Sequence, residues 1–145
     1  MNKQETDLIV EKALGAFGNS YCPYSNFPVA SAVLTQDGQV FVGVNVENAS
    51  YGGTICAERS AIVSAVSNGY RNFKGIVVIT KLPDGGAPCG LCRQFLVEFG
   101  NMEVLFATPD GQIKKKTTCF ELLPMHFGPQ SLAEHRENTT NLSTL

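Results

Sequence analysis

Two short apolar runs constrain the fold of this chain more than any other feature of its sequence. They are Ile76–Thr80 and Val104–Thr108, and a segment of helical character, Cys89–Phe99, lies between them. Strands that are apolar throughout are typical of parallel sheets covered on both faces. Because a helix between two strands provides the crossover that parallel strands need, the two runs are predicted to be parallel. The sequence therefore predicts an α/β fold.

The other expected elements extend this pattern on both sides. Their ranges are 5–18 for an amphipathic helix, Val29–Thr35 and Gln39–Val46 for a hairpin across Asp37-Gly38, Cys56–Val66 for a second helix, Gln112–Thr117 for a short strand and Phe120–Leu123 for a helical turn. The predicted fold is a three-layer α/β/α sandwich around a mixed sheet of about five strands. A single domain is expected over residues 1–132, followed by a disordered polar tail over 133–145.

Charge and composition exclude several classes of protein. The chain has 11 basic and 13 acidic residues, a net charge of −2, so a general affinity for nucleic acid is not expected. Its apolar runs are far shorter than the roughly 20 residues of a membrane-spanning helix, and its first residues carry no apolar signal sequence. A cytoplasmic location is expected. There, an odd number of cysteines, five, indicates metal binding or chemistry rather than disulfides.

Three of these cysteines fall at the predicted starts of helices. Cys56 begins one helix, and Cys89 and Cys92 share the first turn of the next. Helix N-termini favour thiolates, and three thiolates can hold a catalytic zinc ion with its fourth position left for water. Glu58 supplies a carboxylate that could take the proton of such a water and return it to a leaving group. Because residues 56 and 58 point apart on a regular helix, Cys56 is expected to lie at the helix cap.

The order and spacing of several motifs identify a family resemblance. The stretches are Asn45-Val-Glu-Asn-Ala-Ser-Tyr51, Cys56-Ala-Glu-Arg59 and Pro88-Cys-Gly-Leu-Cys-Arg-Gln94. Together they resemble cytidine deaminases of the small, homotetrameric type with an all-cysteine zinc site. The likeness extends from Tyr24-Ser-Asn-Phe27 to Leu122-Leu-Pro-Met-His-Phe-Gly-Pro129, which is most of the chain. It departs from the family pattern at Ala30-Ser31, where Gly-Ala is usual, and at Gly53, where a bulkier residue is common.

The resemblance implies a mechanism and its residues. One Zn²⁺ per chain would be held by Cys56, Cys89 and Cys92, and Glu58 would be the proton shuttle. The reaction would be hydrolytic deamination of cytidine and 2′-deoxycytidine to uridine and 2′-deoxyuridine with release of ammonia, a step of pyrimidine salvage. Activated water would attack C4 of a ring protonated at N3 by Glu58, which then carries a proton to the departing amine. No organic cofactor would be needed.

The resemblance also implies the substrate contacts. Asn45 and Glu47 match the pair that holds the ribose hydroxyls, and the alternation along their predicted strand places both on the same face. Phe27 matches the aromatic residue that packs on the pyrimidine ring, and the backbone at Ala57 matches the group that hydrogen-bonds the base. A final set matches positions that reach a neighbouring subunit's pocket in such tetramers, namely Ala49, Tyr51 and Phe127.

Arg59 has a separate electrostatic argument. Zinc with three thiolates carries a net charge of −1, which makes ionisation of a bound water harder than at a three-histidine site. Arg59 follows Cys56 by three residues on the same helix face and could donate to its sulfur. At about 4 Å and an effective dielectric constant near 20, its positive charge is worth roughly 4 kcal/mol. Arg59 is therefore expected to support the metal ligands.

Other interpretations of these residues remain open at this point. Cys89 and Cys92 could form a thioredoxin-type redox pair, and Cys119 could complete a structural four-cysteine zinc site. Cys22 and Cys119 are otherwise expected to be ordinary buried or half-buried cysteines. Apart from Arg59, the only charged residues in 45–60 are the acids Glu47 and Glu58. Neither would bind a phosphate, which favours a free nucleoside over a nucleotide as substrate. A related deaminase of a cytosine-bearing antibiotic of the blasticidin kind is the alternative enzyme.

Overall fold

A mixed five-stranded sheet forms the centre of the molecule. The computed structural model describes residues 1–142, and the order of the strands is β2-β1-β3-β4-β5. The strands are β1 (Ala30–Thr35), β2 (Val40–Val44), β3 (Phe73–Ile79), β4 (Glu103–Ala107) and β5 (Ile113–Thr118). The helices are α1 (Lys3–Phe17), a 3₁₀ turn (Tyr51–Gly53), α2 (Ala57–Ser67), α3 (Gly90–Val97), α4 (Cys119–Leu122) and α5 (Pro129–Leu142). Most of the bounds lie within two or three residues of those predicted.

The directions of the strands bring two loops together at one end of the sheet. β3 and β4 are parallel, as the two apolar runs predict, and β1 is antiparallel to both β2 and β3. β2, β3 and β4 therefore run in the same direction, and their carboxyl ends share an edge. The connections that leave β2 and β3 at this edge lead into α2 and α3. In open α/β sheets such an edge is where ligands bind.

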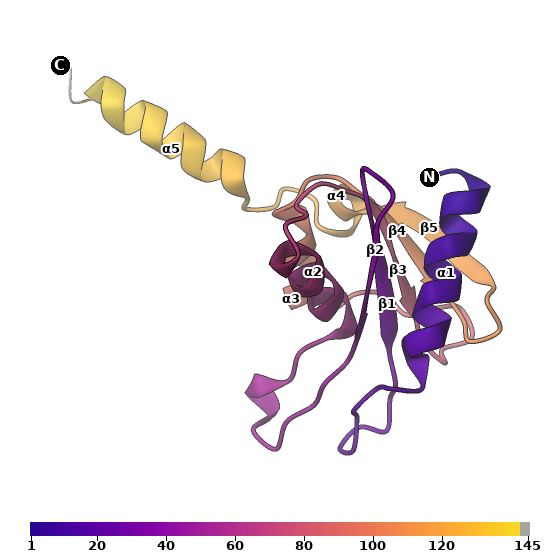
Figure 1. Ribbon diagram of the computed structural model, residues 1–145. Helices are drawn as coiled ribbons and strands as arrows, with labels where there is room; N and C mark the ends of the chain where they lie inside the picture. The colour runs from indigo at the N-terminus through magenta and orange to yellow at the C-terminus, as the bar shows by residue number, and fades with distance from the viewer. Residues whose placement is uncertain (143–145) are drawn as a thin grey trace.

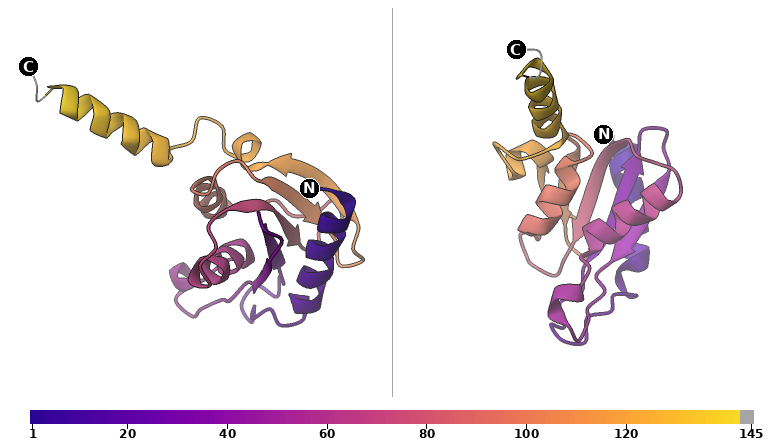
Figure 2. Two further views of the ribbon diagram at one scale, coloured as in Figure 1. Left: turned by 45° about the horizontal axis from the view of Figure 1, so that its top comes forward. Right: turned by 90° about the vertical axis from the view of Figure 1, so that its left-hand side faces the viewer.

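The predicted three layers are confirmed. Helix α1 covers one face of the sheet, and α2 and α3 cover the other (Figures 1 and 2). Alternate residues of the central strands supply the two cores, because side chains along a strand point to opposite faces. On β3, for example, Ile76 packs in the core beneath α2 and α3, and Val77 packs in the core beneath α1. Continuous apolar runs were required because both faces of these strands are buried.

A glycine on β2 allows helix α2 to approach the sheet closely. A Cβ atom placed on Gly43 would lie 2.4 Å from the carbonyl oxygen of Ala57 and 2.3 Å from the backbone nitrogen of Ala61. Both atoms belong to the backbone of α2, so no side chain could turn away to make room. Gly43 thus fixes the position of the first turns of α2, which include Glu58.

The end of the chain differs from the sequence prediction. Residues 129–142 form helix α5, which extends away from the sheet, where a disordered tail was expected from residue 133 (Figures 1 and 2). None of its described residues is buried. Local contacts support it instead, such as the hydrogen bond from Gln130 Nε2 to Glu134 Oε1 one turn away (3.1 Å). The polar composition correctly predicted that this segment is exposed, but the predicted disorder is wrong for residues 133–142, which are helical. Residues 143–145 lie outside the described part of the chain.

No helix among residues 1–142 is both long enough and apolar enough to cross a bilayer.

Candidate metal centre and active site

The first residues of α2 and α3 carry the three cysteines that the sequence singled out. Cys56 is the N-cap of α2 and Cys89 is the N-cap of α3, both with extended backbone angles, and Cys92 lies in the first turn of α3. The cap position of Cys56 confirms the expectation that its backbone is still turning, which lets its side chain face the same way as that of Glu58. Neither cap side chain bonds a backbone N–H of its helix, so both thiols are available for another partner.

The three sulfur atoms form a compact group. The Sγ atoms of Cys56, Cys89 and Cys92 all lie within 4.8 Å of one another, and those of Cys56 and Cys89 are 3.8 Å apart. Tetrahedral zinc with Zn–S bonds of about 2.3 Å places its sulfur ligands about 3.8 Å apart. The donor set and its spacing therefore fit one zinc ion with three protein ligands, which is the ligand number of a catalytic rather than a structural site.

Arg59 supports this group from the first turn of α2. Its Nη2 donates to the Sγ atom of Cys56 at 3.3 Å, the contact that the helix spacing predicts. This hydrogen bond raises the pKa of the Arg59 guanidinium, so the side chain stays charged. Its Nε is the one buried side-chain nitrogen or oxygen in residues 1–142 without a hydrogen-bond partner. The cation offsets part of the negative charge that three thiolates would gather.

Ionisation of the thiols follows from their contacts. The hydrogen bond with Cys92, aided by Arg59 and Cys89, lowers the pKa of the Cys56 thiol to about 5. The same pairing raises the pKa of Cys92, because one proton is shared between the two sulfurs. Of these two thiols, Cys56 is thus the one that ionises first in the metal-free protein. A thiolate is the form that binds zinc.

Glu58 is a buried carboxyl group beside this sulfur cluster. Only 4% of its surface is exposed. Burial raises its pKa above the ordinary value, and the negative charge at Cys56 adds to the effect. A carboxyl group whose neutral form is favoured can donate a proton as well as accept one, as a proton shuttle must.

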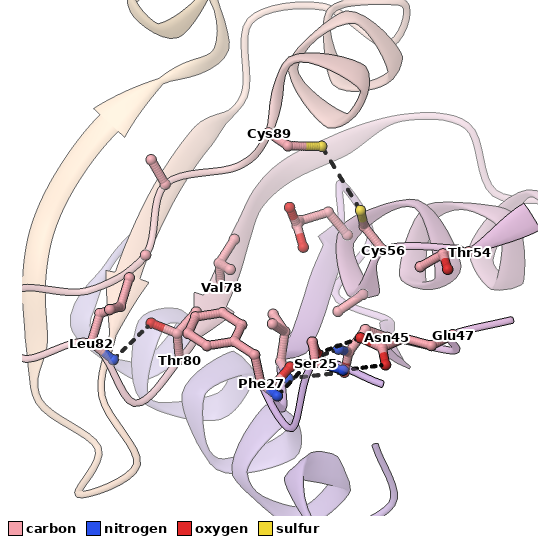
Figure 3. Close-up of a pocket in the computed structure, with 15 residues that line it drawn as sticks. Ser25, Phe27, Asn45, Glu47, Thr54, Cys56, Val78, Thr80, Leu82 and Cys89 are labelled. Carbon is pink, nitrogen blue, oxygen red and sulfur yellow. Dashed lines mark hydrogen bonds between the residues drawn. The ribbon is translucent and has the colours of Figure 1, made fainter. Parts of the chain in front are cut away.

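A cavity of about 440 Å³ connects the sulfur cluster to the loops at the end of the sheet. Cys56 and Cys89 lie at one end, and Ser25, Phe27 and Asn45 lie at the other (Figure 3). The remaining lining residues are Val29, Glu47, Thr54, Ala57, Glu58, Val78, Thr80, Leu82, Gly86 and Ala87. Among these described lining residues none is basic, and the only charged ones are the two acids. Its volume is that of a small-molecule site.

Asn45 and Glu47 both line this cavity, and both also organise the loop that carries Phe27. The Asn45 amide donates to the carbonyl oxygen of Phe27 at 2.8 Å and accepts from the N–H of Val29 at 2.9 Å. The Glu47 carboxylate accepts from the N–H groups of Tyr24 and Ser25, each at 3.0 Å. The structure thus gives these two residues a local role that the sequence did not indicate.

Phe27 and Ala57, the two residues expected to contact the base, both line the cavity. The ring of Phe27 faces the cavity beside Val78 and Thr80 (Figure 3). Ala57 is fully buried at the first residue of α2 and lines the cavity next to Cys56. Helix N-termini present free N–H groups, so this position can offer a backbone donor to a ligand.

Three predicted substrate residues do not line the cavity of this chain. Ala49 is exposed, Tyr51 is 74% exposed against the ring of Tyr24, and Phe127 is 61% exposed. Tyr51 borders a smaller adjoining hollow that also includes Ser25 and Glu47. These three positions lie outside the cavity of their own chain, so a role for them in substrate binding would require another subunit.

Comparisons with known proteins agree with this site. A family model described as the cytidine and deoxycytidylate deaminase zinc-binding region matches residues 3–108. The chain belongs to this deaminase family. A probable cytidine deaminase from Dictyostelium discoideum is 48% identical over 138 residues, covering 94% of this chain and 93% of its own. A cytidine deaminase from Sporosarcina psychrophila is 39% identical, covering 89% and 96%.

Solved structures give the same result for the fold. A 1.6 Å crystal structure of cytidine deaminase from Burkholderia pseudomallei shares 43% identity and a TM-score of 0.80, covering 88% of this chain and 100% of that one. A cytidine deaminase structure from Mycobacterium tuberculosis shares 35% identity and a TM-score of 0.72, covering 84% and 96%. The predicted fold class is therefore confirmed, and the chain is a zinc enzyme of the cytidine deaminase type.

Two alternatives for the cysteines lose their structural basis in this deaminase. Cys119 is buried in the core beneath α2 and α3, and the described metal-binding group does not include it. Burial in this apolar core raises the pKa of its thiol to about 11. A structural site with four cysteines is thus not formed. The isolated redox pair fails as well, because Cys56 joins Cys89 and Cys92 at the same point.

Several residues of this deaminase site escaped the sequence analysis. The side chain of Arg93 donates from Nε to the carbonyl oxygen of Pro88 at 2.8 Å and from Nη1 to that of Leu122 at 2.9 Å. It thereby ties the loop before Cys89 to helix α4. Thr80 and Gly86 form one wall of the cavity, where a Cβ on Gly86 would lie 2.5 Å from the Thr80 side chain. For Arg93 the available signal was its place in a matched motif, directly before Gln94. The close packing of Gly86 on Thr80 leaves no such signal in the sequence.

Proposed function

We propose that the protein catalyses hydrolytic deamination of cytidine and 2′-deoxycytidine, releasing ammonia and the corresponding uridine. The single observation that carries this is the meeting of three cysteine sulfurs and one buried carboxyl group, Glu58, at one end of a cavity. Membership of the deaminase family and the names of its relatives support the reaction.

Each residue of the site has a task in this reaction. Zinc bound by Cys56, Cys89 and Cys92 supplies Lewis-acid activation of a water molecule. Glu58 takes both protons of that water in turn: it gives one to N3 of the pyrimidine ring, which makes C4 more electrophilic, and carries the other to the amine, which departs as ammonia. Its raised pKa suits the donating role, because burial favours the protonated carboxyl group that gives a proton to the ring. Arg59 holds Cys56 in place and offsets thiolate charge.

The cavity favours a free nucleoside. Phe27 offers a ring face for the pyrimidine, and Glu47 and Asn45 offer an acceptor and an amide for sugar hydroxyls. The acids Glu47 and Glu58 are the charged groups of its described lining, so a phosphate on the sugar would meet repulsion rather than a partner. Stacking on Phe27 and hydrogen bonds to the sugar would together orient C4 toward the metal centre.

The same reasoning extends to assembly. We expect a homotetramer in which Ala49, Tyr51 and Phe127 reach the cavity of a neighbouring subunit, since all three are exposed and lie outside the cavity of their own chain. Activity should then depend on assembly. Specific activity measured along a dilution series, with size determined by light scattering, tests this, and a constant value down to the monomer would contradict it.

A substrate panel tests the proposed reaction. The loss of ultraviolet absorbance is followed with cytidine, 2′-deoxycytidine, cytidine 5′-monophosphate and a blasticidin-type antibiotic. The proposal predicts turnover of the two nucleosides, with the nucleotide slower by at least about tenfold. Turnover of the antibiotic alone would refute it in favour of the related deaminase, and preference for the nucleotide would refute the charge argument.

A further inference from the structure

The carboxylate of Glu47 is held by one short segment of the loop between α1 and β1. Its Oε1 accepts from the backbone N–H groups of Tyr24 and Ser25, both at 3.0 Å, and its Oε2 accepts from the hydroxyl of Ser25. The hydrogen bonds from Ser25 are the main cause that lowers the pKa of Glu47, so the carboxylate stays ionised. Glu47 thus meets the cavity in a fixed orientation.

The hydroxyl of Ser25 also holds the next cavity residue. While it donates to Glu47, it accepts from the backbone N–H of Phe27 at 3.0 Å. Between them Asn26 has a φ of 54°, in the left-handed region that asparagine tolerates better than most residues. The Ser25 hydroxyl therefore closes a tight turn that points Phe27 into the cavity.

Counting hydrogen bonds limits what Glu47 can still bind. A carboxylate has about four acceptor positions, and three are already occupied by the loop. The free position belongs to Oε2, the oxygen that Ser25 orients. A sugar hydroxyl that binds there shares this oxygen with the same serine that positions Phe27.

We propose that Ser25 is a positioning residue that couples recognition of the sugar to placement of the Phe27 ring. The inference rests on the proposed function and extends it. Ser25 touches neither C4 nor the metal ligands. Instead, it sets the direction of the free acceptor on Glu47 and the position of the aromatic ring at once, so a nucleoside gains from both contacts only while this hydroxyl is present.

Two substrates that differ by one sugar hydroxyl test the coupling. The ratio of kcat/KM for 2′-deoxycytidine over 2′,3′-dideoxycytidine measures what the 3′-hydroxyl contributes. For Ser25→Ala we expect this ratio to fall by about tenfold, with KM for 2′-deoxycytidine raised and kcat changed less than about threefold. Ser25→Thr keeps a hydroxyl and should restore most of the ratio. Ser25 is exposed, so the alanine variant should fold. Its melting temperature and zinc content are to be compared with those of the wild type.

Ser20→Ala is the matched control. The Ser20 hydroxyl also secures this loop, through the carbonyl oxygens of Phe17 (3.0 Å) and Val29 (3.1 Å), but it does not line the cavity. Ser20→Ala should therefore leave the ratio of the two kcat/KM values unchanged. An unchanged ratio in Ser25→Ala, or an equal loss for both substrates, would overturn the inference while the proposed function stands. A wild-type protein that deaminates neither cytidine nor 2′-deoxycytidine would refute the proposed function itself.

Discussion

Replacement of Gly43 by alanine should disturb the active site from a distance. The added methyl group would lie 2.3–2.4 Å from two backbone atoms of α2, so the helix must retreat by about 1 Å to restore ordinary van der Waals contact. Forced overpacking of this kind costs about 1–3 kcal/mol. For a chain of this size the loss lowers the melting temperature by roughly 3–10 °C.

The same movement shifts Cys56 and Glu58 relative to Cys89 and Cys92, because the first pair begins α2 and the second pair begins α3. A displacement near 1 Å can reduce turnover by about 100-fold. Differential scanning fluorimetry and steady-state kinetics with cytidine measure the two effects on one sample.

Gly15→Ala is the matched control for Gly43→Ala. A Cβ at Gly15, on the exposed side of α1, would meet nothing within 4 Å. Gly15→Ala should raise the free energy of unfolding by about 0.5–1 kcal/mol, because alanine favours the helix, and should leave turnover unchanged. If Gly43→Ala matched the wild type in both melting temperature and turnover, the close contact of α2 with β2 would not position the site.

Three further variants probe the site and its supports. In metal-free protein, Glu58→Gln should raise the free energy of unfolding at pH 7 and not at pH 4. Burial raises the pKa of Glu58 in the folded state. The wild type therefore loses stability only as the pH rises above the pKa of the unfolded state, near 4.5, and glutamine removes that loss. Denaturation at both pH values checks this, and an equal effect at each would contradict it. Arg93→Ala removes two hydrogen bonds to carbonyl oxygens and should lower the free energy of unfolding by about 2 kcal/mol. It should also weaken zinc binding about tenfold, as measured by chelator competition. Unchanged zinc affinity would show that the loop at Pro88 does not need this arginine. Asn26→Ala should destabilise by about 1 kcal/mol and Asn26→Gly should not, since asparagine tolerates the φ of 54° better than alanine does and glycine adopts it freely; equal urea midpoints would refute the argument.

Much of the fold could be predicted because its signals are local. Ile76–Thr80 and Val104–Thr108 had to be apolar throughout to lie between two layers of helices, and they are central strands β3 and β4. The alternation along Gln39–Val46 likewise predicted that Val40 and Phe41 lie on opposite faces, and the structure packs Phe41 in the core beneath α2 and Val40 in the core beneath α1. Where no apolar pattern exists, as in residues 133–142, exposure could be predicted but not the helix that these residues form.

The site could be predicted only for residues that belong to short, recognisable motifs. Cys56, Glu58, Cys89 and Cys92 stand at helix starts, so their meeting followed from the order of the elements. The tasks of Ser25, Gly43 and Arg93 depend instead on contacts between segments that are distant in the chain. Gly43, for example, is required because of a helix that begins 14 residues later, and the residues next to Gly43 in the sequence do not predict this contact.

Zinc content and turnover of cytidine, measured together on the wild type and on Glu58→Ala, test the central claim most directly. The account predicts about one zinc ion per chain in both proteins, rapid loss of cytidine absorbance with the wild type, and a loss of at least about 1000-fold in kcat with the variant. Retained turnover in Glu58→Ala would contradict the assignment of the proton shuttle. A wild type without zinc, in which Cys89 and Cys92 oxidise readily to a disulfide, would contradict the metal centre itself.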